Sequence, residues 1–147
     1  MISIRRWVFE TNSSSTHSIS IEEWDLDFKT DYGIIEIETW DFWWSWLDYY
    51  DFYTKASYIR TWIVNTWNWT HEKIFKETIS EFTWCEVICK RWEWDEWDEY
   101  YSDGYIDHQS LDIWDFFSSF KESETKEKIK KFLFNSSSSL FIWNDNW

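Results

Sequence analysis

Proline is absent from this sequence and glycine is nearly absent, with 2 glycines in 147 residues. A domain of this length carries about 10 glycines, because average usage is roughly 7%. No apolar run reaches the ~20 residues that span a bilayer, since Asp, Glu or Asn interrupts each one. The opening MISIRRWVFETN also lacks the apolar core of a signal peptide. These absences disfavour a membrane protein and favour an intracellular, cytoplasmic location.

Cysteine is also scarce, and basic residues are outnumbered by acidic ones. Cys85 and Cys89 are the only cysteines, and their C-x3-C spacing with no second pair predicts neither a disulfide framework nor a metal site. The 14 Lys and Arg are outnumbered by 28 Asp and Glu, which gives a net charge of -14. Such a charge repels phosphate backbones and anionic lipid, so we expect neither nucleic-acid nor membrane binding. A cation or a basic protein partner is easier to accommodate.

Tryptophan is the residue in excess, with 16 copies. Few glycines and prolines beside many Lys, Ile, Asn and Phe indicate an AT-rich genome, in which the UGG codon should be rare. The segment RWEWDEWDEYYSDG (91–104) places Trp92, Trp94 and Trp97 among acids with no strand or helix period. Glycine at these positions would make an ordinary Gly/Asp-rich loop. We therefore hypothesise that most of the tryptophans are UGA codons that the source genome reads as glycine. The alternatives are a truly Trp-rich protein and a genome that reads UGA as tryptophan.

Hydrophobic periodicity predicts the secondary structure. Ile19 and Ile21 alternate with Ser18 and Ser20, which is typical of a strand with one buried face. The same reasoning predicts strands at 4–9, 17–22, 33–39, 84–90, 104–108 and 139–143, helices at 51–65, 71–82 and 124–134, and a helical turn at 111–119. Strands on both sides of a helical middle predict one α+β domain over residues 1–147, with a mainly antiparallel sheet and about three helices.

The most polar motif is FETNSSSTHS, which runs from Phe9 to Ser18 between two expected strands. A serine-rich turn can offer backbone N–H and hydroxyl donors to an anion. His17 can act as a general base toward a hydroxyl, with Glu10 orienting it. A plain hairpin turn is the alternative, because Asn and Ser favour turns without any further function. The candidate catalytic residues are Glu10 and His17, and the candidate ligand-binding residues are Asn12, Ser13, Ser14 and Ser15.

A second polar motif, GYIDHQS, covers residues 104–110. Asp107 and His108 stand at the end of an expected strand, where such a pair can serve proton transfer, and Ser110 follows as a candidate ligand-binding residue. A hydrogen-bonded surface histidine is the simpler reading of the pair. If the two motifs form one site, His17 must lie close to the 104–110 segment. A third cluster, Asn144-Asp145-Asn146, is typical of a terminal turn.

The segment WVFETNSSSTHSI (7–19) resembles the N-terminus of an uncharacterised family of small phage and bacterial proteins, whose pattern reads G-V-F-E-T-N-S-S-S-T-H-S. The likeness extends to DFYTKASY (51–58), DGYIDHQS (103–110) and FLFNSSSSLFIWNDN (132–146). Glycine would be expected in such relatives at Trp7, Trp40, Trp43 and Trp143, and proline would suit Phe52 and Ser136. The resemblance implies a phage-type protein with an important N-terminal motif, and it supplies no reaction.

Two functions from different classes fit these observations. The first is an enzyme, or a ligand-binding remnant of one, that performs phosphoryl or nucleotidyl chemistry or hydrolysis on a small anionic ligand. The polar N-terminal motif would form one wall of its site, and Asp107 with His108 the other. The second is a non-catalytic phage accessory or host-interaction protein whose acidic surface meets a basic partner, in the host cytoplasm if the gene is phage-encoded. The sequence indicates no particular cofactor.

The recoding hypothesis predicts the codons of the tryptophans. We expect UGA at Trp92, Trp94 and Trp97, in a genome with few UGA stops and a glycine-charged tRNA that reads UGA. Reading the gene's nucleotide sequence checks this directly. UGG at these three positions would contradict the hypothesis.

Overall fold

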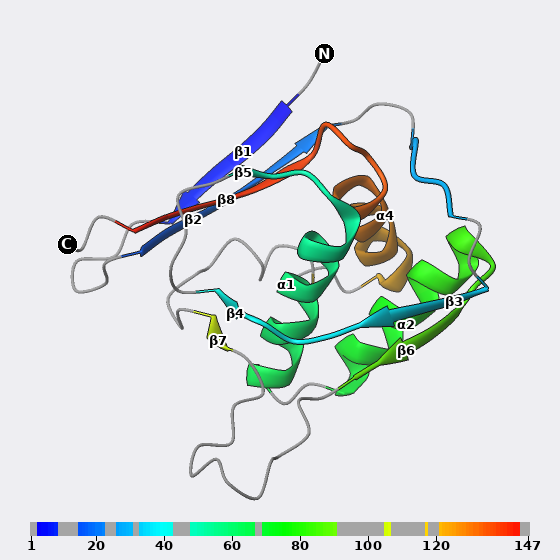
Figure 1. The fold of residues 1–147 in the computed structure, drawn as a ribbon. Helices are drawn as coiled ribbons and strands as arrows, with labels where there is room; N and C mark the ends of the chain where they lie inside the picture. The colour runs from blue at the N-terminus through cyan, green and yellow to red at the C-terminus, as the bar shows by residue number, and fades with distance from the viewer. Residues whose placement is uncertain are drawn as a thin grey trace, which may run out of the picture.

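The computed structural model describes residues 3–8, 15–22, 26–30, 33–42, 48–66, 69–90, 105–106, 117 and 121–144. Three helices and a set of short strands make up this part of the chain (Figure 1). The strands precede and follow the helical middle, which confirms the predicted α+β class. No helix among the described residues is long and apolar enough to cross a membrane.

The largest sheet has four antiparallel strands in the order β1-β2-β8-β5. Their bounds are β1 Ser3–Val8, β2 Ser15–Glu22, β8 Ser139–Asn144 and β5 Asp48–Tyr49. The first and last strands of the chain thus meet in one sheet (Figure 1). Buried Ile19, Leu140 and Ile142 from β2 and β8 belong to the hydrophobic core. The period-2 patterns that predicted these strands therefore mark the sheet face that packs inward.

Two further strand pairs are parallel, which the sequence analysis did not foresee. β3 (Ile34–Ile37) pairs with β6 (Glu86–Cys89), and β4 (Asp41–Phe42) pairs with β7 (Tyr105–Ile106). A parallel pair needs a long crossover, and the helices between β3 and β6 supply it. Strands of two residues, such as β4 and β5, are too short to produce a periodic pattern. The predicted helical turn at 111–119 lies outside the described residues except for Phe117.

The helices are α1 (Phe52–Thr66), α2 (Trp69–Thr83) and α4 (Glu122–Leu133). The carboxylate of Asp51 accepts a hydrogen bond from the Thr54 N–H at 2.9 Å, so Asp51 is the N-cap of α1. α1 occupies the middle of the molecule (Figure 1), and every residue from Thr54 to Val64 is buried. α2, α4, β3 and β7 all contact α1, so this helix has almost no solvent face.

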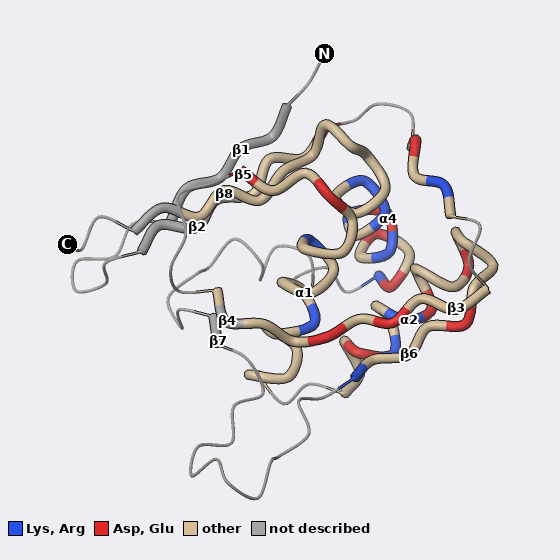
Figure 2. The backbone as a smooth tube through the Cα atoms, in the orientation of Figure 1, with Lys and Arg blue, Asp and Glu red and all other residues tan. Residues whose placement is uncertain are grey.

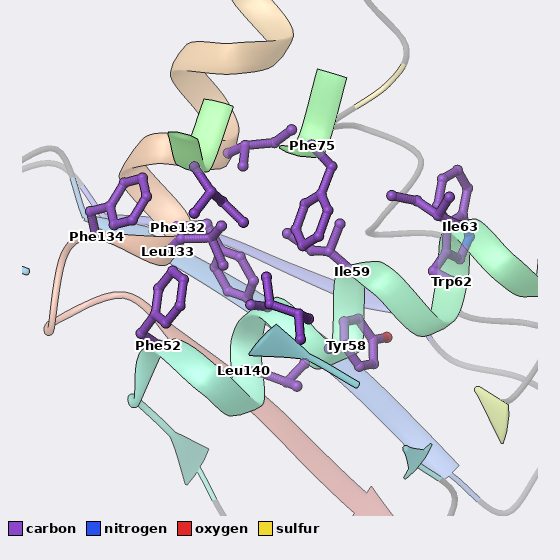
Figure 3. Packing of buried hydrophobic residues seen from close by; sticks show 14 of the residues in the cluster. Phe52, Tyr58, Ile59, Trp62, Ile63, Phe75, Phe132, Leu133, Phe134 and Leu140 are labelled. Carbon is purple, nitrogen blue, oxygen red and sulfur yellow. The ribbon is translucent and has the colours of Figure 1, made fainter. Parts of the chain in front are cut away.

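Stacked aromatic rings fill the core where α1, α2 and the end of α4 meet (Figure 3). The Phe134 ring stacks on Phe52 at 5.5 Å between centroids and on Phe82 at 4.0 Å. Phe28 stacks on Phe52 at 4.4 Å between centroids, and its ring also lies 5.5 Å from that of Phe134. Such rings contribute both buried apolar area and favourable ring contacts. They connect α1 and α2 to the turn that follows α4.

Trp84 ends α2 in an unusual way for a tryptophan. Its φ is 63°, in the left-handed region, and its side chain is 92% exposed. Its N–H donates to the carbonyl of Ser80 at 2.8 Å. This is the arrangement in which a helix ends on a left-handed residue, and glycine is the usual residue there because it has no Cβ to clash. Residue 84 therefore has the backbone of a helix-terminating glycine.

The described tryptophan side chains divide into two kinds. Trp62 is 4% exposed and packs inside the core, whereas Trp40, Trp69 and Trp84 are exposed by 43% or more. Trp92, Trp94 and Trp97, on which the recoding hypothesis was first based, lie outside the described residues. Among the described positions, Trp62 is the one whose ring the core needs.

Replacing Trp84 and Trp62 by glycine should change stability in opposite directions. Trp84→Gly relieves the left-handed strain of a residue with a Cβ, so we expect the free energy of unfolding to rise by about 1 kcal/mol. Trp62→Gly removes a buried ring, so we expect a loss of at least about 3–5 kcal/mol. Urea unfolding of both variants measures these changes. A loss of stability in Trp84→Gly would show that the exposed ring contributes to the fold.

Candidate functional site

Most residues of the two predicted motifs lie outside the described part of the chain. This holds for Glu10, Asn12, Ser13, Ser14, Asp107, His108 and Ser110. The backbone of Ser15 and His17 is described, because both belong to β2. The structure therefore shows which strands lie next to these motifs.

The polar N-terminal motif connects two paired strands, as predicted. β1 and β2 are antiparallel, and Val8 opposite His17 is the pair at that end of the ladder. The connection between these strands, residues 9–14, lies outside the described residues. On its other side β2 pairs with β8, which sets Ser15 opposite Asn144. The start of the third polar cluster thus lies beside the first motif, a neighbourhood that the sequence analysis did not predict.

The second motif begins in a different sheet. Tyr105 and Ile106 form β7, which pairs with β4 and not with any strand of the four-stranded sheet. The expected closeness of His17 to the 104–110 segment stays a prediction, because Asp107 to Ser110 are outside the described residues.

The segments 51–58 and 132–146 meet at a buried lysine. Lys55 of α1 is 0% exposed, and its ammonium donates to the carbonyls of Asn135 and Ser138, each at 3.0 Å. The ring of Phe132 lies 5.6 Å from the same ammonium. Charge-assisted hydrogen bonds of this kind hold the turn between α4 and β8 against α1.

The serines of the run 136–139 complete this polar network. The Asn135 amide donates to the Glu22 carbonyl, and the Glu22 N–H donates to the Ser138 hydroxyl. The hydroxyl and the N–H of Ser136 both donate to the Asp27 carboxylate. These two bonds hold the pKa of Asp27 below its usual value. The run of serines therefore has a structural role, because it connects the α4–β8 turn to β2 and to the segment after it.

Lys55 is a structural group whose proton is easily lost. Burial lowers the pKa of Lys55 to about 8 from an ordinary value of 10.5, although the charges of Asp51 and Asp27 oppose the shift. A neutral amine still has two N–H groups, so both hydrogen bonds to the turn can persist. The sequence contained a signal for this position, since Lys55 stands four residues before Ile59 on the apolar face of a helix.

The α2–α4 surface carries a compact charge cluster. The Lys126 ammonium lies 3.3 Å from Glu77, 3.0 Å from Glu81 and 3.4 Å from Glu122. These carboxylates raise the pKa of Lys126, and Lys126 in turn lowers the pKa of Glu77. One lysine thus compensates part of the acidic charge where the two helices meet. Surface ion pairs of this kind contribute little to stability.

Within the described ranges there is no group of three His, Cys, Asp or Glu side chains that could hold a metal ion. Cys85 is buried and Cys89 is half-buried, and both are free thiols. Comparisons with protein-family models, with curated proteins and with solved structures found no match to this chain. The arrangement of residues is thus the basis for a functional proposal.

The burial of Lys55 predicts a specific pH dependence of stability. Between pH 8 and 10.5 the unfolded chain keeps the lysine proton that the folded chain has released, so raising the pH favours folding. We expect the wild-type protein to gain about 3 kcal/mol over Lys55→Met across this window, at about 1.4 kcal/mol per unit of pKa difference. Urea unfolding of both proteins at several pH values measures the difference between their free energies of unfolding. Contributions of the other titrating groups cancel in this difference, because both proteins contain them. A difference that does not change with pH would contradict the lowered pKa.

Proposed function

We propose that this chain binds and processes a small phosphate-bearing ligand, such as a nucleotide, at one end of the four-stranded sheet. The observation that carries this proposal is the strand register, which sets Ser15 of the first polar motif opposite Asn144 of the third. Two segments rich in hydroxyl and amide groups therefore begin at the same end of one sheet. A hairpin without further function would not need the C-terminal cluster as its neighbour.

The strand register also suggests a role for each of these residues in binding or catalysis. The serine-rich connection after β1 would supply N–H and hydroxyl donors to the phosphate oxygens. His17 lies two residues into β2, next to that connection, and would act as the general base, with Glu10 orienting it. Asp107 and His108 would form the opposite wall. Donors from Asn12, Ser13, Ser14, Ser15 and Ser110 would complete the ligand contacts.

Variants of Ser15 and His17 test the proposal. We expect Ser15→Ala and His17→Ala each to weaken phosphate or nucleotide binding about tenfold, because a lost hydrogen bond to a charged group contributes at least ~1.4 kcal/mol. Isothermal titration calorimetry with inorganic phosphate and with a nucleoside triphosphate measures the affinities. Ser123→Ala, which changes an exposed serine of α4, serves as the matched control. Equal affinities in all four proteins would rule out this end of the sheet as the site.

A second proposed function is that of a non-catalytic phage accessory or host-interaction protein. Figure 2 shows acidic positions along β3 and β6, where Glu36, Glu38 and Glu86 are exposed. Lys90 pairs with Glu36 at 3.0 Å, and the carboxylates at the α2–α4 contact already share Lys126. The β3–β6 face is therefore the more available surface for a basic protein partner. Absence of phosphate binding together with salt-sensitive binding of a basic partner would favour this function.

We also propose that the gene comes from a phage or bacterial genome that reads UGA as glycine. The backbone supports this at Trp84, where the φ of 63° suits glycine and the ring is almost wholly exposed. Trp62 is a genuine tryptophan under the same proposal, because its buried ring packs 5.0 Å from Phe117. The exposed rings of Trp40, Trp69 and Trp84 would then be absent from the native surface.

A further inference from the structure

We propose a second ligand site, for an oxyanion such as a phosphate or carboxylate group, at Arg60 of α1. It goes beyond the function proposed above, because it uses other elements: the carboxyl ends of β3 and β6 and the first turn of α2. A buried guanidinium whose hydrogen-bonding capacity is mostly unused indicates the site.

Arg60 is 2% exposed, yet the described residues satisfy only part of its hydrogen-bonding capacity. Its Nη2 pairs with the Glu72 carboxylate at 3.3 Å. Neither Nε nor Nη1 has a hydrogen-bond partner within the described part of the chain. Buried donors are normally paired, and a buried charge that is incompletely paired is strongly unfavourable. The ion pair with Glu72 is longer than a strong charge-assisted hydrogen bond, so Glu72 alone does not explain why an arginine stands here.

The contrast with Lys55 on the same helix strengthens this point. Lys55 is equally buried, and its ammonium donates to two carbonyls at 3.0 Å. The fold therefore satisfies one buried base of α1 with its own backbone and leaves N–H groups of the other unused. Folding stability alone would favour an apolar side chain at position 60.

A second buried polar group lies in the same region. Ile37 pairs with Cys89 at the carboxyl end of β3 and β6, and the chain then continues to Thr39, which is fully buried. The Thr39 hydroxyl also has no hydrogen-bond partner among the described residues. The next residue, Trp40, donates its N–H to the hydroxyl of Thr61 at 3.0 Å, which places this segment against α1 one residue along the chain from Arg60. The carboxyl ends of parallel strands are where α/β proteins commonly bind ligands.

The charges around this point favour an anion despite the acidity of the whole protein. Arg60, Glu72 and Lys76 all lie close enough to the Cys89 thiol to act on its ionisation, and together they carry one net positive charge. A planar guanidinium matches the oxygens of a phosphate or a carboxylate. Glu72 has a 19% exposed side chain and Cys89 is half-buried, so this side of the cluster faces the solvent. Glu72 occupies part of the guanidinium and would compete with the ligand.

The test uses inorganic phosphate and succinate, each compared with chloride at constant ionic strength, and measures melting temperature and calorimetric affinity. We expect at least one of the two anions to raise the melting temperature of the wild-type protein. In the His17→Ala background, where binding at the sheet end is weakened, Arg60→Met should abolish the remaining shift. The ligand-free Arg60→Met protein should melt no lower than its parent, since it loses a poorly satisfied buried charge. Arg60→Lys keeps the charge and loses the planar fork, so we expect about tenfold weaker binding.

Glu72→Gln removes the competing charge and should tighten binding by about threefold. Lys73→Met is the matched control, because it removes an exposed cation of the same helix turn and should leave the shift unchanged. No shift with either anion would overturn the proposal, as would a shift in His17→Ala that persists when Arg60→Met is added. His17→Ala should retain the Arg60-dependent shift. Loss of the shift in His17→Ala together with its retention in Arg60→Met would assign the binding to the sheet end instead. The response to phosphate or to succinate identifies the ligand class.

Discussion

The two hydrogen bonds from the buried Lys55 ammonium to the carbonyls of Asn135 and Ser138 are the interaction on which the arrangement of this fold depends. They hold the central helix to the turn between α4 and β8. The same turn connects to β2 through Glu22, which both donates to Ser138 and accepts from Asn135. β8 therefore enters the sheet beside β2 in one register, which brings the N- and C-terminal polar motifs together. A polar network of this kind specifies the turn because the Lys55 ammonium, the Asn135 amide and the Ser138 hydroxyl each have a partner.

α1 carries two buried bases with different explanations. Lys55 is satisfied by backbone carbonyls, so its role is structural, and its lowered pKa follows from burial. Arg60 keeps N–H groups without partners in the described structure, and the buried hydroxyl of Thr39 also has no partner there. Groups that folding leaves unsatisfied are those that a ligand can satisfy. Burial does not distinguish these two bases, because both are nearly inaccessible to solvent. Their hydrogen bonds do distinguish them.

The tryptophans show how a backbone can disagree with a side chain. Trp62 packs in the core beside His71 and Phe117, so its environment requires a large ring. Trp84 has a left-handed backbone and an exposed ring, so its environment requires no side chain at all. The codon hypothesis came from composition, and the conformation of residue 84 is independent of composition. Under the proposed recoding, residue 84 would be glycine and its exposed ring would be absent from the apolar surface.

The sequence by itself determined the helices and the long strands, because periodicity and capping are local. The helices expected at 51–65, 71–82 and 124–134 occur at Phe52–Thr66, Trp69–Thr83 and Glu122–Leu133. The polar motifs can also be recognised in the sequence alone. The pairing of β1 with β2 followed from their adjacency along the chain. Tertiary structure decided the parallel β3–β6 pair, the two-residue strands, and the partners of Lys55 and Arg60. These features depend on contacts between residues far apart in the chain, such as Lys55 and Ser138. Such contacts produce no periodic pattern in the sequence, because burial and pairing arise only when the elements pack.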